Sequence, residues 1–234
     1  LSGRWQMSRQ EYFRRHHLDP EKKLIAFAAT ALSISPNLHL IELLARTIGE
    51  LHQPAQLLIR LHPNHFKAQK HYRQEAQAIY EVARRYPDVH VVEPAEVPGG
   101  LERYSGEDFP EKASMLAHCD VLVTVYSTMV VEAALHDKPF ISACIDVPGG
   151  WKDEFWVPLY EVSGWPTAAR VNKMGAGKLA LTPDELRAAL EAYLSDPGLN
   201  RAERRAFVES EVTYLDGSAT RRTADFLWSL AEGK

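Results

Sequence analysis

The stretch CDVLVTVYSTMVVEAALHDKPFI, residues 119–141, decides the fold class that the sequence predicts. Residues 121–125 form an apolar run with the length of a buried strand, and a helix is predicted over 127–136. A second apolar run follows over 140–145, after a Lys-Pro break. Strand, helix and strand joined by short connections are typical of a parallel βαβ unit.

One residue of the predicted helix, Glu132, interrupts an otherwise apolar run over 129–135. It does not complete a capping box, because the acid of that motif stands three residues after the Ser or Thr cap. An ordinary solvated helix position is one interpretation. The other uses spacing: Thr128 and Glu132 are four residues apart and share a helix face. An anion held by the N–H groups and hydroxyls at Ser127 and Thr128 would then leave a sugar diol within reach of the carboxylate, as in a nucleotide site.

The composition bounds the class of protein. The chain has 234 residues, of which 45% are hydrophobic and 25% charged, as in a globular protein of one large or two small domains. A net charge of −4 gives no general attraction to nucleic acid, so nucleic acid is not a predicted partner. No apolar run approaches the roughly 18 residues of a bilayer-spanning helix, and no signal peptide is visible. Cys119 and Cys144 lack CxxC spacing and are predicted to be buried thiols of a cytoplasmic protein.

Strand-like and helix-like segments alternate from residue 24 onward. The predicted strands cover 24–30, 55–63, 89–94, 121–125, 140–145 and 177–181. The predicted helices cover 37–52, 68–86, 109–119, 127–136, 182–197, 200–211 and 217–231. This alternation predicts an α/β fold with a doubly wound, Rossmann-like parallel sheet and helices on both faces, with ligands at the carboxyl ends of the strands. Residues 146–175 show no clear period, and a short helix or strand within them stays open.

The start of the chain suggests a domain boundary. The first twenty residues are polar and helix-like, carry no initiator Met, and end at Asp19 and Pro20 ahead of the first strand. We expect residues 1–20 to be a linker or the remnant of a missing N-terminal domain. Residues 21–234 are expected to form one nucleotide-binding domain.

The motif RLHPN, residues 60–64, ends the second predicted strand, where ligands gather in such sheets. Arg60 offers a fork of donors, and His62 offers a donor for a phosphate or a base edge. The alternative is that His62 and Pro63 only terminate the strand. The spacing does not separate these two interpretations.

Signals for other chemistries are weak. The phosphate loops GxGxxG and GxxxxGK[ST] do not occur in the sequence, and GAGK at 175–178 precedes a strand and is predicted to be a turn. Ser127 lacks the glycines of a nucleophile elbow. No spacing typical of a metal site is formed by the neighbouring histidines His16, His17, His65 and His71. No metal and no cofactor are therefore predicted.

Four segments, in this order, resemble the C-terminal, nucleotide-sugar-binding domain of GT-B glycosyltransferases: RLHPN, FPEKASMLAHCDVLVTVYSTMVVEAALHDKPFI, TPDELRAALEAYLSDP and DGSATRRTADFLWSL. The chain looks most like the CDP-glycerol glycerophosphotransferases and the capsule or surface polysaccharide transferases. UDP-N-acetylglucosamine 2-epimerases are similar but slightly further off. The resemblance covers nearly the whole chain from residue 20 and implies one half of a GT-B fold.

The resemblance also implies roles for five residues. Ser127 and Thr128 match the positions that hold the donor phosphates, and Glu132 matches the acid that binds the ribose hydroxyls. Arg60 and His62 match a donor-site motif.

The resemblance further implies that the nucleobase lies against residues 93–109, with Phe109 or Tyr104 as stacking candidates. Val125 departs from the Asp that many relatives carry before the Tyr. The catalytic residues are unknown, because the general base is expected in the missing N-terminal domain.

The resemblance therefore implies the donor-binding domain of a metal-independent GT-B transferase. It would move a glycosyl or glycerophosphoryl group from a nucleotide-activated donor to a surface polysaccharide or glycolipid acceptor, and would be inactive as an isolated domain. The predicted partners are a nucleotide-sugar or CDP-glycerol donor and the missing acceptor domain of the same polypeptide, with peripheral membrane association of the full-length protein as a further option. Two alternatives stay open: a UDP-sugar 2-epimerase-like enzyme, and a non-catalytic domain that has kept only the fold.

Overall fold

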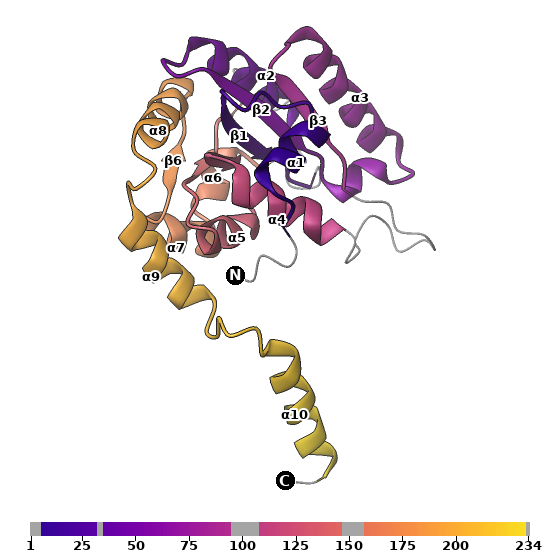
Figure 1. Ribbon diagram of the computed structural model, residues 1–234, viewed down its shortest axis with the longest axis vertical. Coiled ribbons are helices and arrows are strands. Elements are labelled where there is room, and N and C mark those ends of the chain that lie inside the picture. The colour runs from indigo at the N-terminus through magenta and orange to yellow at the C-terminus, as the bar shows by residue number, and fades with distance from the viewer. Residues whose placement is uncertain (1–5, 32–34, 95–107, 147–156, 233–234) are drawn as a thin grey trace.

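Six parallel strands form the central sheet of the computed structural model, which describes residues 6–31, 35–94, 108–146 and 157–232. The strands lie in the order β3-β2-β1-β4-β5-β6. Their bounds are β1 (Lys23–Ala28), β2 (Ala55–Arg60), β3 (Val89–Val92), β4 (Val121–Thr124), β5 (Phe140–Ala143) and β6 (Lys178–Ala180). The chain runs from β1 to one edge and returns to place β4 on the other side of β1 (Figure 1), which confirms the predicted doubly wound sheet.

Helices cover both faces of this sheet (Figure 1). One face packs against α2 (Leu38–Thr47), α3 (Lys70–Arg85), α6 (Leu159–Ser163) and α8 (Pro183–Ser195). The other packs against α1 (Arg9–Arg15), α4 (Phe109–His118), α5 (Met129–Leu135), α7 (Pro166–Met174) and α9 (Arg201–Glu211). Alternate residues of β1 separate the two cores, because successive side chains of a strand point to opposite faces. Ile25 and Phe27 belong to the first core, and Leu24 and Ala26 to the second.

The first helix, α1, is part of the second core. Tyr12, Phe13 and Leu18 are buried there. After the helix, the amide of Asp19 donates to Oε1 of Gln56 in β2 at 2.9 Å, which ties the segment to the sheet. Residues 6–20 are therefore packed on the sheet, while their origin as a linker to a further domain stays a prediction.

The connection over 146–175 contains two helices in its described part, where the sequence left one short element open. α6 follows Pro158, and α7 begins with Pro166. Each helix buries only two side chains, which is too few for a helical period to be detected from sequence. The GAGK segment forms the predicted turn: Gly175 ends α7 with φ of +66°, a conformation that suits glycine.

The start of α8 and the two cysteines agree with their predictions. Thr182 caps α8, since its hydroxyl accepts a hydrogen bond from the amide of Glu185 at 3.2 Å. Cys119 and Cys144 are buried free thiols, and burial raises the pKa of each to about 12. No helix within the described ranges combines the length and the apolar character that crossing a membrane requires.

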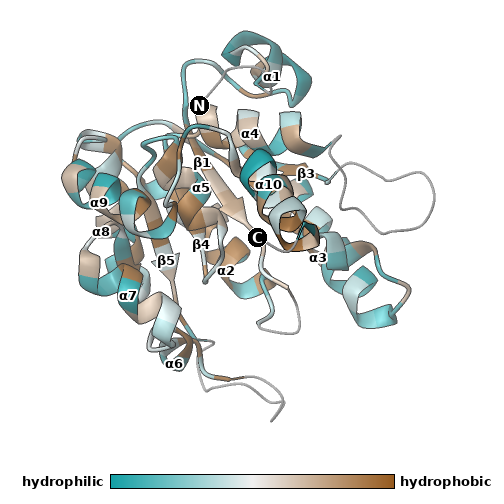
Figure 2. Cartoon of the chain, turned by 90° about the horizontal axis from the view of Figure 1, so that it is seen from below, coloured by the Kyte–Doolittle hydropathy of each residue, from teal (hydrophilic) through white to brown (hydrophobic). Residues whose placement is uncertain are grey.

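The last helix, α10 (Ala219–Ala231), differs from the others because none of its residues is buried. It lies away from the body of the molecule in Figure 1, and its ribbon in Figure 2 carries both hydrophilic and hydrophobic residues. Its large apolar side chains are 57% to 68% exposed: Phe226, Leu227, Trp228 and Leu230.

Arg204 of α9 is a buried cation that joins two turns, with 1% of its side chain exposed. Its guanidinium donates to the carbonyls of Leu199 at 2.5 Å and Pro197 at 3.0 Å, both after α8. It also donates to Oδ1 of Asp137 at 3.2 Å, in the turn between α5 and β5, where the φ of Asp137 is +53°. Arg204 thus fixes the start of β5 relative to the end of α8.

Replacing Arg204 by Met is expected to lower the free energy of unfolding by about 2–4 kcal/mol, because the carbonyls that it satisfies lose their donors. The measurement is urea denaturation followed by circular dichroism. Arg205→Met is the matched control, since Arg205 is the exposed neighbour on the same helix, and it should change stability by less than about 0.5 kcal/mol. Equal effects of the two substitutions would contradict this role for Arg204.

Candidate functional site

Polar residues, among them the predicted site residues His62 and Ser127, follow the carboxyl ends of neighbouring strands. Thr30 follows β1, His62 follows β2, and Ser127 follows β4. After β1 the chain enters α2 on one face of the sheet, and after β4 it enters α5 on the other. β1 and β4 are therefore the strands at which the winding of the sheet reverses, and such a point is where open α/β sheets bind ligands.

The start of α5 presents hydroxyls to this edge. Ser127 is half-buried, and its Oγ accepts a hydrogen bond from the amide of Met129 at 3.2 Å. The amides of Val130 and Val131 donate to the carbonyls of Ser127 and Thr128 at 3.1 and 3.0 Å. The first amides of the helix, which we expected to be open to an anion, thus already donate within the turn. The exposed Thr128 and the hydroxyl of Ser127 are the groups that this turn offers to a phosphate.

Glu132 lies on the partly exposed side of α5, and its side chain is 35% exposed. The other sides of the helix are packed, since Val130, Ala133 and Ala134 are buried. The carboxylate of Glu132 pairs with Lys112 of α4, whose Nζ lies 2.9 Å from Oε2 and 3.1 Å from Oε1. Lys112 is not among the residues predicted from the sequence, because its partner is twenty residues away on another helix and no local spacing connects them.

Arg60 ends β2, but its guanidinium points into the protein. Its side chain is 6% exposed and forms an ion pair with Asp108, the residue immediately before α4. Its Nη1 is buried and has no hydrogen-bond partner among the described residues. This geometry differs from the open donor fork that the sequence suggested, and it favours a role in which Arg60 holds the start of α4 against the end of β2.

His62 caps the short 3-10 helix η3 (Pro63–Phe66), since its Nδ1 accepts a hydrogen bond from the amide of Asn64 at 3.1 Å. The neutral ring therefore carries its proton on Nε2. Burial, together with the nearby charges of His65, Lys67 and Arg60, lowers the pKa of His62 to about 4. At neutral pH the ring is thus an uncharged N–H donor. His62 both terminates the strand and keeps donor chemistry, so the two interpretations of RLHPN are compatible.

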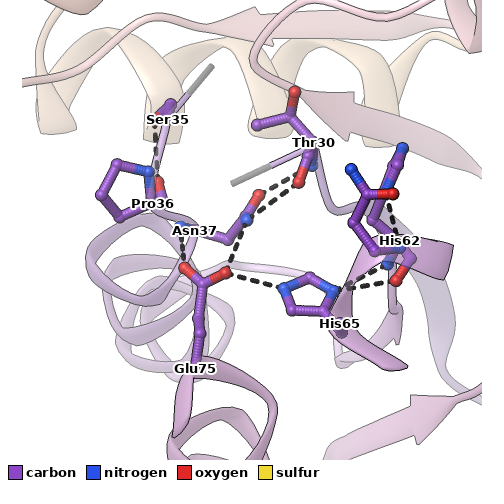
Figure 3. A network of polar contacts seen from close by, with 8 residues as sticks. Thr30, Ser35, Pro36, Asn37, His62, His65 and Glu75 are labelled. Atoms are coloured by element: carbon purple, nitrogen blue, oxygen red, sulfur yellow. Dashed lines mark hydrogen bonds and ion pairs between the residues drawn. The ribbon is translucent and has the colours of Figure 1, made fainter. Parts of the chain in front are cut away.

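A buried polar network lies behind His62 (Figure 3). The Nδ1 of His65 accepts from the amide of His62 at 3.0 Å, and its Nε2 lies 2.7 Å from Oε2 of Glu75. Asn37, at the start of α2, donates to both oxygens of Glu75, from its amide at 2.5 Å and from Nδ2 at 3.2 Å. Asn37 also exchanges hydrogen bonds with the backbone of Thr30, at 2.8 and 3.1 Å. The network therefore fixes the ends of β1 and β2 relative to each other.

Of the two residues predicted to stack on the base, Phe109 is described in the structure and Tyr104 is not. Phe109 is the first residue of α4 and is 51% exposed, with Nζ of Lys112 5.7 Å from its ring centroid. Tyr104 lies outside the described residues. The structure thus brings Phe109, Lys112 and Glu132 together on neighbouring helices.

The histidines considered for a metal have other contacts. His16 lies 3.0 Å from a carboxylate oxygen of Glu111, and the ring of His71 packs against Tyr72. Across the described ranges, no three His, Cys, Asp or Glu side chains gather as a metal ion would require.

The strand order, the helices on both faces and this edge define a Rossmann-like domain of the kind that makes up one half of a GT-B fold. The sequence model of the family described as CDP-Glycerol:Poly(glycerophosphate) glycerophosphotransferase matches residues 40–229, which is more than half of the chain. The chain belongs to this family. No curated protein matches it in sequence.

Solved structures share the fold at low identity. The S. aureus MnaA-UDP co-structure is 15% identical with a TM-score of 0.56, covering 94% of this chain and 48% of that one. The Wall Teichoic Acid Polymerase TagF is 14% identical with a TM-score of 0.54, covering 96% and 47%. A TagF variant with CDPG is 16% identical with a TM-score of 0.53, covering 97% and 46%. The chain spans about half the length of these proteins.

Acidification tests the state of His62. We expect its ring resonances to titrate with a midpoint near 4, well below the ordinary value of about 6.5. Because the unfolded chain binds a proton at His62 between these values and the folded chain does not, stability should fall as the pH falls from about 6.5 to about 4. NMR titration of the histidine ring protons measures the midpoint, with His62→Gln to assign the signal. A midpoint at the ordinary value would contradict the burial of this ring.

Glu75→Gln tests the buried network. In glutamine one of the two acceptor oxygens becomes an NH2 donor, which would face a donor of Asn37 or His65, so we expect a loss of about 2–3 kcal/mol in the free energy of unfolding. Urea denaturation measures it. Glu81→Gln, on the same helix with 54% of its side chain exposed, is the control and should be nearly neutral. A neutral Glu75→Gln would show that the network does not stabilise the fold.

Proposed function

We propose that this chain is the donor-nucleotide-binding domain of a GT-B transferase that moves a glycerophosphoryl group, or a related glycosyl group, to a surface polysaccharide or glycolipid acceptor. The match of residues 40–229 to the glycerophosphotransferase family carries this proposal. The candidate side chains at the carboxyl edge of the sheet support it. The family favours CDP-glycerol as the donor over a nucleotide sugar.

In the proposed complex, the donor diphosphate lies between the loop after β2 and the start of α5. Ser127 and Thr128 contribute hydroxyls, and His62 contributes an N–H donor that stays uncharged at neutral pH. Glu132 accepts hydrogen bonds from the ribose hydroxyls. Arg60 does not contact the donor in this proposal; through its ion pair with Asp108 it holds the start of α4 in place.

The proposed reaction is a displacement at phosphorus. An acceptor hydroxyl oxygen forms a bond to the phosphorus that carries glycerol, and the bond from that phosphorus to the bridging oxygen of CMP breaks. The hydroxyl proton passes to a base, which we assign to a further domain of the polypeptide. Hydrogen bonds and helix dipoles stabilise the departing CMP without a divalent metal, so transfer by the full-length protein should persist in EDTA.

Calorimetric titration of the chain with CDP, CDP-glycerol, UDP and UDP-N-acetylglucosamine tests the donor site. We expect saturable binding of CDP and CDP-glycerol. Ser127→Ala and His62→Phe should each weaken it by about 5- to 30-fold, the equivalent of one or two lost hydrogen bonds. His52→Phe is the control, because His52 is exposed and precedes β2 at the opposite edge of the sheet.

The other outcomes separate the alternatives. Binding of UDP and its sugar without CDP would favour the epimerase-like enzyme. No binding of any nucleotide would favour a domain that has kept only the fold.

A further inference from the structure

Lys112 is a charged residue at the candidate site that has no role in the proposed function so far. It lies in the first turn of α4, which begins at Phe109. Its Nζ contacts both carboxylate oxygens of Glu132, at 2.9 and 3.1 Å, and lies 5.7 Å from the centre of the Phe109 ring. One ammonium group therefore touches the acid proposed for the ribose and lies near an aromatic ring proposed for the base.

The contacts among Lys112, Glu132 and Phe109 contribute little to the stability of the fold. The side chains of Lys112 and Glu132 are 26% and 35% exposed, and ion pairs at such positions contribute little to folding. Phe109 is 51% exposed, so its ring does not serve the core. The group instead forms a partly open surface on the first turns of two helices that both begin at the carboxyl edge of the sheet.

The ammonium restricts the carboxylate. A free glutamate side chain samples several rotamers, and fixing one of them on ligand binding costs conformational entropy. Because Nζ lies within hydrogen-bond distance of both oxygens, it holds the carboxylate of Glu132 in one orientation. A vicinal diol needs such an orientation, since its two hydroxyls donate to the two oxygens together.

We propose that Lys112 is a positioning residue that holds Glu132 ready for the ribose diol and thereby sets a preference for ribonucleotides over deoxyribonucleotides. The inference rests on the proposed donor site and adds sugar specificity to it. Lys112 acts here through Glu132, not through the phosphates.

The experiment compares the affinities of CDP and 2′-deoxy-CDP by calorimetry, with UDP and 2′-deoxy-UDP as a second pair of probes. We expect the wild-type chain to prefer CDP by about tenfold, the equivalent of one hydrogen bond to a charged group. Lys112→Met and Glu132→Gln should each reduce this preference by about threefold or more, whereas Lys112→Arg should keep it. The double variant should discriminate no worse than Glu132→Gln alone, because both substitutions act on one contact.

Lys23→Met is the matched control. Lys23 pairs with Asp120 at 3.4 Å with similar exposure, and it lies at the amino ends of β1 and β4, away from the site. It removes the same charge and should leave the preference for CDP unchanged. Circular dichroism confirms that each variant is folded.

The outcomes distinguish this inference from the proposed function. If the wild-type chain binds no nucleotide, both fail. If it prefers CDP and Lys112→Met keeps the full preference, only the role of Lys112 is overturned. An equal loss of affinity for CDP and 2′-deoxy-CDP in Lys112→Met would assign the ammonium to the phosphates and would also overturn the inference.

Discussion

The parallel pairing of β1 with both β2 and β4 is the constraint on which the rest of the structure depends. Parallel strands need crossover connections, and these place helices on the faces of the sheet. The central strands β1, β2 and β4 are accordingly buried along almost their whole length. Because all six strands run in one direction, every following loop starts at the same edge, so the candidate site residues gather there.

Gathering polar groups at the end of a buried sheet carries a desolvation cost, and the structure offsets it with pairs. Arg60 is paired with Asp108, and Glu75 with His65 and Asn37. A buried charge is tolerated only when it is paired and hydrogen-bonded in this way. These pairs fix the loops from the buried side of the edge. Ser127, Thr128 and Glu132 stay at least partly exposed at the surface of the same edge.

The sheet and one part of the candidate site could be predicted from the sequence. Apolar runs and their alternation with helical periods are local properties, so the six strands and the doubly wound arrangement could be predicted. The pairing of Thr128 and Glu132 on one helix face could also be predicted, since their spacing of four residues is a local signal.

The contacts that the sequence did not reveal join residues far apart in the chain. Lys112 meets Glu132 across two helices, and Arg60 meets Asp108 across forty-eight positions. The inward direction of Arg60 depends on the burial of its surroundings, which a strand-end motif does not encode. α6 and α7 could not be predicted for another reason: two buried side chains in each helix are too few to define a helical period.

The exposure of α10 has a consequence for how the molecule unfolds. Since none of its side chains is buried, opening this helix exposes little additional apolar surface. A helix of thirteen residues gains only marginal stability from its own hydrogen bonds in water, where isolated helices shorter than roughly 12–15 residues rarely persist. Its backbone amides therefore exchange with solvent through local opening, independently of the cooperative unfolding that protects the strands. In this chain, α10 and the sheet form separate units of stability.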